Sequence, residues 1–567
     1  MSEETAEEAS KKAPVKPKKK GKVAQEGPIT LRWKLGELPS AQHRAGLAGL
    51  VLMVQWLDRQ GGEKKGVCRL IDLDERGVGL EVDLDGLRRL FDELYAASVE
   101  ESVENQARKH KVTKEVIPPI RTEEKVTVDE KGKEKRKTVY VYPTTVPRGG
   151  LLVSWEPNLD NNGLWIRLWR SLIWSVIRGV PATRRPFESR AEKEPTDDAD
   201  RAWLQLTDER DPSVDLPSTY YLGAQSSTAE SVGFQDRARA QFLLHFWPYV
   251  IQIYVPQSWN TKEGRADFAG YAVVVPDIAQ LRSFVEELPY VMQQRTAAAD
   301  RYRPREAVVD LALESALDAS LRLRESLIRH QGAKSTANLV QGFEVLHVDK
   351  EGNNVRVYST ARFAPEAAMV DEYALVRKTL RDLLFRRQRL INLVKRRPWF
   401  EGFDRVAGTM SFKILTGRVR FAADARHTFE ERSRLVMASD ESPGINTEEA
   451  LDVLVYKMIR NYVNRKVESK TGLRWDAVPP GKRREVDEAR EKIARQAFLD
   501  VRSRSGSDFE GYFAGTLCSV PQFIKPEDFT RLSAALRKDA DNLRTLTLLA
   551  LSAASWTRPE SKTEETK

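Results

Sequence analysis

A short polar turn within residues 220–254 carries side chains suited to contacting nucleic acid. Its members are small or carry amide and hydroxyl groups: Gly223, Gln225, Ser226, Ser227 and Thr228. Amides and hydroxyls donate and accept hydrogen bonds with base edges, sugars and phosphates, and glycine keeps the backbone approachable. A helix-capping loop is the alternative, in which Ser227 or Ser231 caps the helix that follows and Asp236 lies in its first turns.

A second polar turn precedes residues 164–178. It contains Asn158, Asn161, Asn162 and Gly163. Asparagine can pair bidentately with adenine, although turn formation alone also explains this composition. Trp165 and Trp169 recur at helical spacing and predict a buried helix face, with Arg178 on the opposite, basic side. Arg184 and Arg185 continue that basic character beyond the expected helix end and are candidate phosphate contacts.

The strongest electrostatic signal lies at residues 376–399, VRKTLRDLLFRRQRLINLVKRRPW, which predict one amphipathic helix. The cations of this segment are Arg377, Lys378, Arg381, Arg386, Arg387, Arg389, Lys395, Arg396 and Arg397. Within 377–397 only Asp382 opposes them in the sequence. Such a face repels itself unless a polyanion covers it, so we expect contact with a nucleic-acid backbone. A solvated basic face is the alternative.

Residues 332–336, GAKST, superficially resemble a phosphate-binding loop. Ala333 stands where that motif needs glycine, and the earlier glycine is missing, so we reject the motif itself. Lys334 is retained as a candidate phosphate contact.

Catalytic constellations are missing from the sequence. Two Asp-x-Asp pairs, Asp72 with Asp74 and Asp83 with Asp85, could bind a metal ion, but turns and a helix cap at Asp85 explain them better. The six histidines form no His-Asp pair and no zinc-binding motif in the sequence. We therefore predict no cofactor, no metal and no enzymatic activity. The alternative is a metal-dependent nucleic-acid-processing enzyme that uses these aspartates.

Length and charge indicate a multidomain protein with an anionic partner. The chain has 567 residues, 92 Lys and Arg against 83 Asp and Glu, and a net charge of +9. Two widely separated cysteines and the lack of a signal peptide or a long apolar run predict a cytoplasmic protein without membrane attachment. Residues 1–28 are lysine-rich and lack aromatics, which predicts a disordered basic tail.

The elements that would position these residues form two kinds of domain. Ser40 is expected to cap a helix over Ala41–Arg59, whose Gly46 and Gly49 indicate a closely packed backbone. Residues 67–82 predict a hairpin, and 101–148 predict a long hairpin that is either solvated or a basic finger toward DNA. We expect an α+β domain of mixed sheets and helices over 29–430, an all-α helical bundle over 437–556, and a flexible tail over 557–567.

Two long segments carry a family resemblance. ELPSAQHRAGLAGL at 37–50 and YLGAQSSTAESVGFQDRARAQFLLHFWPYV at 221–250 resemble the large subunit of type I CRISPR Cascade complexes, Myxan subtype. The likeness extends from about residue 29 into the bundle. It implies a non-catalytic subunit that recognises the protospacer-adjacent motif, helps open the duplex and stabilises the R-loop, while the guide RNA reads the sequence.

The resemblance also implies partners. They are the CRISPR guide RNA, target double-stranded DNA with its displaced strand, the Cascade backbone, handle-binding and small subunits, and a helicase-nuclease or transposon-recruitment factors. It further implies that the bundle is similar to the separate small subunit. Met437 and Met458 stand near the start of the bundle and are candidate internal starts for such a product.

Overall fold

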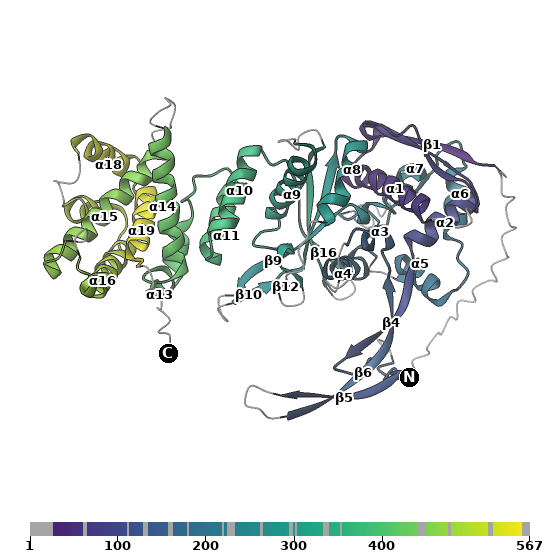
Figure 1. The fold of residues 1–567 in the computed structure, drawn as a ribbon, viewed down its shortest axis with the longest axis horizontal. Helices are drawn as coiled ribbons and strands as arrows, with labels where there is room; N and C mark the ends of the chain where they lie inside the picture. Colours follow the sequence, from purple (N-terminus) through teal and green to yellow (C-terminus); the bar gives the residue numbers. More distant parts are fainter. Residues whose placement is uncertain are drawn as a thin grey trace, which may run out of the picture.

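A computed structural model gives the fold of the chain (Figure 1). It describes residues 27–60, 65–109, 113–128, 134–156, 163–178, 181–217, 220–223, 233–260, 265–293, 299–300, 303–332, 339–351, 354–439, 449–474, 478–519 and 525–557. The predicted tails at 1–28 and 557–567 lie almost entirely outside these ranges.

Helix α1 (Ala41–Arg59) is the central element of the N-terminal region, and nearly all of its faces are buried. Ser40 caps it by accepting a hydrogen bond from the His43 N–H, as predicted. A Cβ atom on Gly46 would lie 2.2 Å from the Leu243 carbonyl oxygen, and one on Gly49 would lie 2.3 Å from that of Phe246. The two glycines therefore allow the close backbone packing that the sequence indicated.

A small antiparallel sheet of order β1-β3-β2 lies beside α1. Its strands are β1 (Ile29–Lys34), β2 (Cys68–Ile71) and β3 (Gly77–Val82), followed by α2 (Leu84–Leu94). The hairpin expected over 67–82 is confirmed. The helix after it is capped by Asp83, whose carboxylate accepts from the Gly86 N–H at 2.7 Å, so the expected cap at Asp85 is wrong.

A three-stranded antiparallel arm projects from the N-terminal region (Figure 1). Its strands are β4 (Ala97–Glu104), β5 (Arg121–Val128) and β6 (Glu134–Pro147), in the order β4-β6-β5. Arg121 of β5 pairs bidentately with Glu101 of β4 at 2.6 Å. Strands β5 and β6 thus form the predicted hairpin, and β4 adds a third strand whose Glu101 balances the charge of Arg121.

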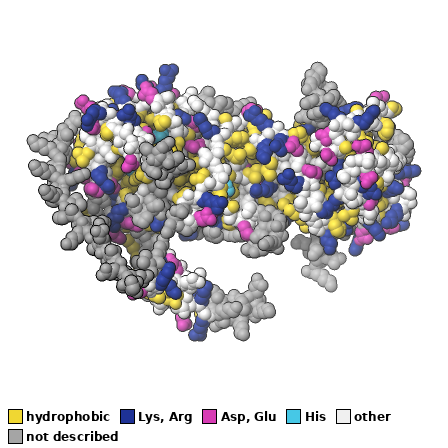
Figure 2. Space-filling model, turned by 180° about the vertical axis from the view of Figure 1, so that it is seen from behind, with side chains coloured by type: hydrophobic (Ala, Val, Ile, Leu, Met, Phe, Trp, Pro, Cys, Tyr) yellow, Lys and Arg dark blue, Asp and Glu magenta, His cyan; other side chains and the backbone are white. Residues whose placement is uncertain are grey.

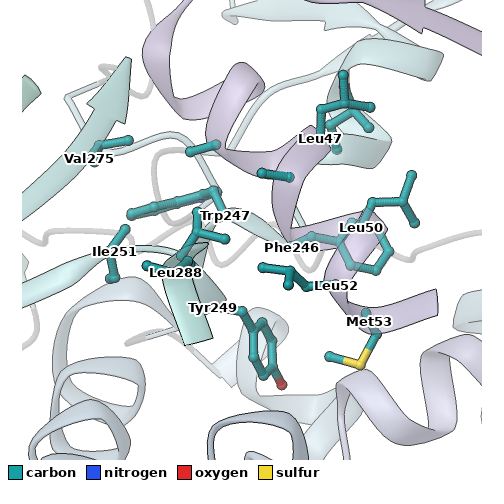
Figure 3. Close-up of a cluster of buried hydrophobic side chains, with 14 of the residues drawn as sticks. Leu47, Leu50, Leu52, Met53, Phe246, Trp247, Tyr249, Ile251, Val275 and Leu288 are labelled. Atoms are coloured by element: carbon teal, nitrogen blue, oxygen red, sulfur yellow. The ribbon is translucent and has the colours of Figure 1, made fainter. Parts of the chain in front are cut away.

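Short helices and strands surround α1 and the base of the arm. They are α3 (Gly150–Val153), α4 (Leu164–Leu172) with a π-helical continuation (Ile173–Ile177), α5 (Pro181–Glu192), α6 (Asp198–Leu206), β7 (Ser213–Asp215), β8 (Gln235–Arg237), α7 (Ala238–Leu243) and the 3-10 turn η4 (Trp247–Tyr249). Figure 3 shows Leu50 of α1 beside Phe246 in the core that joins these elements, a core that also contains Leu47 and Trp247.

The central sheet has the order β10-β9-β11-β15-β16, and β14 pairs with β9. Its strands are β9 (Gln252–Asn260), β10 (Arg265–Phe268), β11 (Tyr271–Ile278), β14 (Val308–Val309), β15 (Val340–Glu351) and β16 (Asn354–Phe363). A two-stranded ribbon, β12 (Ala299–Asp300) with β13 (Arg303–Pro304), accompanies it. Helices α8 (Leu281–Gln293) and α9 (Glu314–Gln331) connect β11 to β15. The Tyr254 hydroxyl donates to Asp318 of α9, while α1 packs on β11, so helices cover both faces.

The C-terminal third is helical. Helices α10 (Ala367–Thr379), α11 (Leu383–Val394), α12 (Phe403–Thr409) and α13 (Phe412–Leu415) lead into a bundle of α14 (Arg420–Ser439), α15 (Glu449–Thr471), α16 (Arg483–Arg502), α17 (Gly506–Tyr512), α18 (Pro526–Lys538) and α19 (Ala540–Ser555). Helix α19 is buried and packs against α14, α15 and α16. Mixed sheets and helices followed by a helical bundle confirm the predicted fold class (Figure 1).

Candidate nucleic-acid interface

The first turn of α1 holds both ends of the polar turn predicted from the sequence. Gln225, Ser226, Ser227 and Thr228 lie outside the described residues, which stop at 223 and resume at 233. On the first side, the buried Gln42 amide donates to the Leu222 carbonyl at 2.9 Å and accepts from the Leu222 N–H at 3.0 Å. On the second side, His43 Nε2 lies 2.7 Å from Asp236 Oδ2. Consecutive residues of one helix therefore fix the two flanks of this segment.

The structure corrects two predictions, one about His43 and one about Asp236. A His-Asp pair exists, between residues 193 positions apart, where no sequence motif could indicate it. Asp236 belongs to β8, and α7 begins only at Ala238 without a side-chain cap, so Asp236 is not in the first turns of a helix. Ser40 Oγ lies 2.8 Å from His43 Nδ1, which completes a Ser-His-Asp series. Because His43 is 2% exposed and Ser40 caps the helix, we assign this series a structural role.

Tyr220, just before the undescribed part of the same segment, belongs to a buried aromatic cluster with His245. Arg178 is 2% exposed and its guanidinium lies 4.2 Å from the ring centre of Tyr220. The expectation that Arg178 contributes to a basic surface is therefore wrong. His245 is hydrogen-bonded to the Tyr95 hydroxyl, and burial, followed by the nearby Arg178 charge, lowers the pKa of His245 to about 3. Because His245 is neutral, the cluster contains the buried charge of Arg178 without a second positive charge on His245.

The asparagine turn is described only at its last residue. Asn158, Asn161 and Asn162 lie outside the described residues, and Gly163 has φ 52° at the start of α4. Trp165 and Trp169 are buried, which confirms the predicted apolar face. Glycine suits the left-handed conformation at this start, so the turn explanation accounts for Gly163 by itself.

Arg184 and Arg185 lie beyond the end of the helix over Leu164–Ile177, as predicted, and within the next helix, α5. Arg184 is half-buried: it donates to the Trp174 carbonyl at 2.6 Å and its guanidinium lies 4.8 Å from the Trp174 ring centre. Arg185 is exposed and pairs with Glu194 and, at 3.8 Å, with Glu192. Arg185 is the more accessible of the two to an anionic ligand.

The basic segment is two helices and not one. Helix α10 ends at Thr379, and Asp382 caps α11 by accepting from the Leu384 and Phe385 N–H groups at 3.0 Å. Asp424 of α14 accepts from the N–H groups of Arg381 and Asp382 at 2.8 and 2.6 Å. The break divides the expected single basic face.

Four of the nine cations face the interior of the protein. Arg386 makes two hydrogen bonds, at 2.5 and 2.9 Å, to the fully buried Asp310, and Arg387 donates to the Asp310 carbonyl. The other two contacts are Arg377 with Glu314 at 3.3 Å and Arg389 with Glu372 at 2.8 Å. Carboxylates from outside 377–397, in α9, its approach and α10, neutralise these four cations, so the expectation of a single basic face that needs a polyanion is wrong.

The remaining cations are exposed. Arg396 and Arg397 form surface pairs with Glu366 and Glu401. Among the described residues from the start of α10 to Arg420, the first residue of α14, seven exposed cations have no carboxylate at ion-pair distance: Lys378, Arg381, Lys395, Arg405, Lys413, Arg418 and Arg420. We call these seven the unpaired basic set. Figure 2 shows Lys and Arg side chains gathered over the segment that joins the bundle to the rest.

The aspartates considered for metal binding have other partners. Asp74 accepts from the Arg76 and Gly77 N–H groups, which lowers its pKa, and Asp72 pairs with Arg32 at 2.7 Å. Asp85 pairs with Arg88 at 3.0 Å. No cluster of three or more potential metal ligands occurs among the described residues. Lys334 lies outside them. In the described ranges, no helix is long and apolar enough to span a bilayer.

Comparison with protein families places the chain in a class. Residues 67–333 match the type I-B CRISPR Cas8b N-terminal domain, and residues 340–554 match the type I-B CRISPR Cas8b C-terminal domain. A search of curated proteins gave no match.

These two matches cover most of the chain and meet between α9 and β15. The class is thus the large subunits of type I CRISPR complexes. Within that class, the chain belongs to the type I-B Cas8b family.

Proposed function

We propose that this large subunit recognises the protospacer-adjacent motif in double-stranded DNA, helps to open the duplex and stabilises the R-loop. The guide RNA reads the target sequence, and the subunit presents the opened target to a helicase-nuclease or to transposon-recruitment factors. It makes and breaks no bonds itself. The resemblance of residues 37–50 and 221–250 supports the Myxan subtype within this class.

One structural observation supports contact with a nucleic-acid backbone independently of the family match. The unpaired basic set lies outside the ion pairs that hold α10 and α11 to the protein, so its charges remain available to a polyanion. Each phosphate contact releases counterions, which makes binding steeply salt-dependent. We therefore assign backbone contact first to Lys378, Arg381 and Lys395, then to Arg396 and Arg397. Arg185 and Lys334 remain further candidates.

Motif reading is assigned to the two polar turns. The segment with Gln225, Ser226, Ser227 and Thr228 is the first candidate, because Gln42 and His43 fix its flanks. The turn with Asn158, Asn161 and Asn162 is the second. A reading loop needs a rigid base, since a small misplacement forfeits base-edge hydrogen bonds worth about 1–3 kcal/mol each.

A binding experiment on the assembled complex tests the proposal. The chain is reconstituted with guide RNA and the partner subunits, then presented with matched targets that carry a randomised flanking motif. We expect enrichment of a short motif and loss of that enrichment in Gln225→Ala or in Asn161→Ala. Equal binding to all flanking motifs by the wild-type complex would contradict motif recognition. Unchanged enrichment in both variants would remove these two residues from the reading set.

The backbone contacts are tested separately by salt dependence. Lys378→Ala, Arg381→Ala and Lys395→Ala should each lower the slope of log affinity against log salt by about one, with motif preference retained. A triple variant with wild-type affinity at every salt concentration would exclude this surface.

A further inference from the structure

Strand β16 is a long exposed edge of the central sheet. It spans Asn354–Phe363 and follows β15 in the strand order, with no strand beyond it among the described residues. Residues 356–360 are all exposed, on both faces of the strand. In the described part of the chain, no element other than β15 packs extensively on it. The outer edge of this strand, about 30 Å long, thus has no strand partner among the described residues.

This edge has only one of the devices that usually protect an edge strand. Natural sheets shield such strands with proline, lysine, a bulge or a very short length. The sequence of β16, NVRVYSTARF, contains no proline and no lysine, and its only charges are Arg356 and Arg362. The one device is a bulge: His347 pairs with Ser359 and Val348 with Val357, so Tyr358 is an extra residue on β16. Val357 is 39% exposed and Tyr358 is 47% exposed. Because regular pairing continues on both sides of Tyr358, the edge remains competent for strand addition there.

We propose that β16 accepts an extended strand from a neighbouring protein subunit of the RNA-guided complex. The main-chain groups of the two strands would pair, and alternate side chains would supply specificity. The proposal depends on the assembly stated under the proposed function.

The charges on β16 define the chemistry of that strand. Arg356 is paired with Glu351 yet 57% exposed, and Arg362 is paired with Asp277 yet 72% exposed. Each guanidinium has five N–H donors, so each arginine can also donate to a further carboxylate. Tyr358 contacts His347 with ring centres 4.9 Å apart and presents its outer side to solvent. The partner strand should carry acidic residues near both arginines and an apolar residue facing Val357 or Tyr358.

A second copy of this chain is a poor occupant. β16 has two arginines and no Asp or Glu, so pairing two copies would bring four arginines to one seam. Like charges on adjacent strands destabilise pairing. An acidic strand from another subunit avoids that cost.

Amide hydrogen exchange tests the proposal directly. Peptides that cover 354–363 are followed in the isolated chain and in the reconstituted complex. We expect exchange to slow by at least about tenfold on assembly, since paired amides open rarely. Val357→Lys should abolish this protection and shorten subunit retention on dilution, whereas Val357→Thr keeps a β-branched residue and should behave as wild type. Equal melting temperatures of the two variants confirm that both fold.

Three outcomes would overturn the inference. Unchanged exchange of β16 in a complex that still binds target DNA would contradict strand addition but not the proposed function. Identical behaviour of the lysine and threonine variants does the same. Protection that rises with the concentration of the isolated chain assigns the edge to a second copy. Failure to recover any complex with guide RNA counts instead against the proposed function on which the inference depends.

Discussion

Gln42 binds both main-chain groups of Leu222, with its amide nitrogen 2.9 Å from the carbonyl oxygen and its amide oxygen 3.0 Å from the backbone nitrogen. The side chain thus forms a two-bond bridge between α1 and the entrance to the polar segment, 180 residues away in sequence. Gln42 is fully buried, so no water can replace these bonds.

Replacing Gln42 with leucine should destabilise the protein and disturb motif recognition. Two buried main-chain groups of Leu222 would lose their partners, at a cost of about 1–3 kcal/mol each. We expect a lower free energy of unfolding in denaturant titration and weaker motif enrichment by the assembled complex. Gln60→Leu is the matched control, because Gln60 is an exposed glutamine at the other end of α1. Equal stability of the two variants would contradict the bridge.

Gly46→Ala should destabilise the protein although it adds only one methyl group. Its new Cβ would lie 2.2 Å from the Leu243 carbonyl oxygen, which α7 cannot move without repacking the core. Overpacking of this kind costs about 1–3 kcal/mol. Gly408→Ala in α12 is the control, since nothing lies within 4 Å of that position. We expect thermal unfolding to show a lower midpoint for Gly46→Ala and an unchanged or higher one for Gly408→Ala.

Local patterns predicted the elements well where neighbouring residues decide the outcome. The cap at Ser40 and the hairpin over 67–82 depend on a few adjacent residues, and the spacing of Gly46 and Gly49 indicated close packing without naming its distant partner, Leu243. The change from an α+β domain to a helical bundle was predicted from the change in hydrophobic periodicity and turn spacing along the chain. These features need no knowledge of distant contacts.

Long-range pairing decided what the sequence could not show. Arg386 looked free because Asp310 lies 76 positions earlier, and His43 looked isolated because Asp236 lies 193 positions later. The break at residues 380–382 did have a local signal, since Asp382 stands directly before an apolar run, as a helix cap does. That signal competed with an apolar periodicity that continues across the break. At the start of α2, Asp83 and Asp85 offer the same capping signal two positions apart, so the sequence alone did not distinguish them.

Arg386→Ala and Arg381→Ala should separate structural from ligand-binding cations. Losing Arg386 leaves the buried Asp310 carboxylate without its bidentate partner, which costs about 3–5 kcal/mol of folding free energy. Arg381 is exposed and contributes only its backbone N–H to Asp424, so alanine there should change stability by less than about 0.5 kcal/mol. Denaturant titration gives the first comparison and the salt slope of DNA binding gives the second. A stable Arg386→Ala variant would show that α10 and α11 are held by other contacts.

Asp424 should make stability fall as the pH rises from about 4 to 6. Burial raises its pKa to about 6, above that of an unfolded aspartate, although the Asp382 and Arg381 N–H groups favour the charged form. A raised pKa means that the folded state binds the proton more tightly, so its stabilising contribution is complete below the unfolded pKa and is lost through the folded one. Asp424→Asn keeps an acceptor for both N–H groups and should remove this dependence. Parallel melting temperatures of the two proteins across this pH range would exclude the effect.

A bundle fragment should fold only when it includes α14. An internal start at Met437 would discard nearly all of α14, and with it Phe421 and Phe429, which are buried in the bundle core. A start at Met458 would fall in the middle of α15, at a residue that is 1% exposed. We expect a fragment over 418–557 to unfold cooperatively and one over 437–557 to bind a hydrophobic dye and resist cooperative melting, because α19 would lose one of its three main partners. A cooperative transition in the shorter fragment, or its recovery by mass spectrometry from the purified complex, would instead support a separately made small subunit.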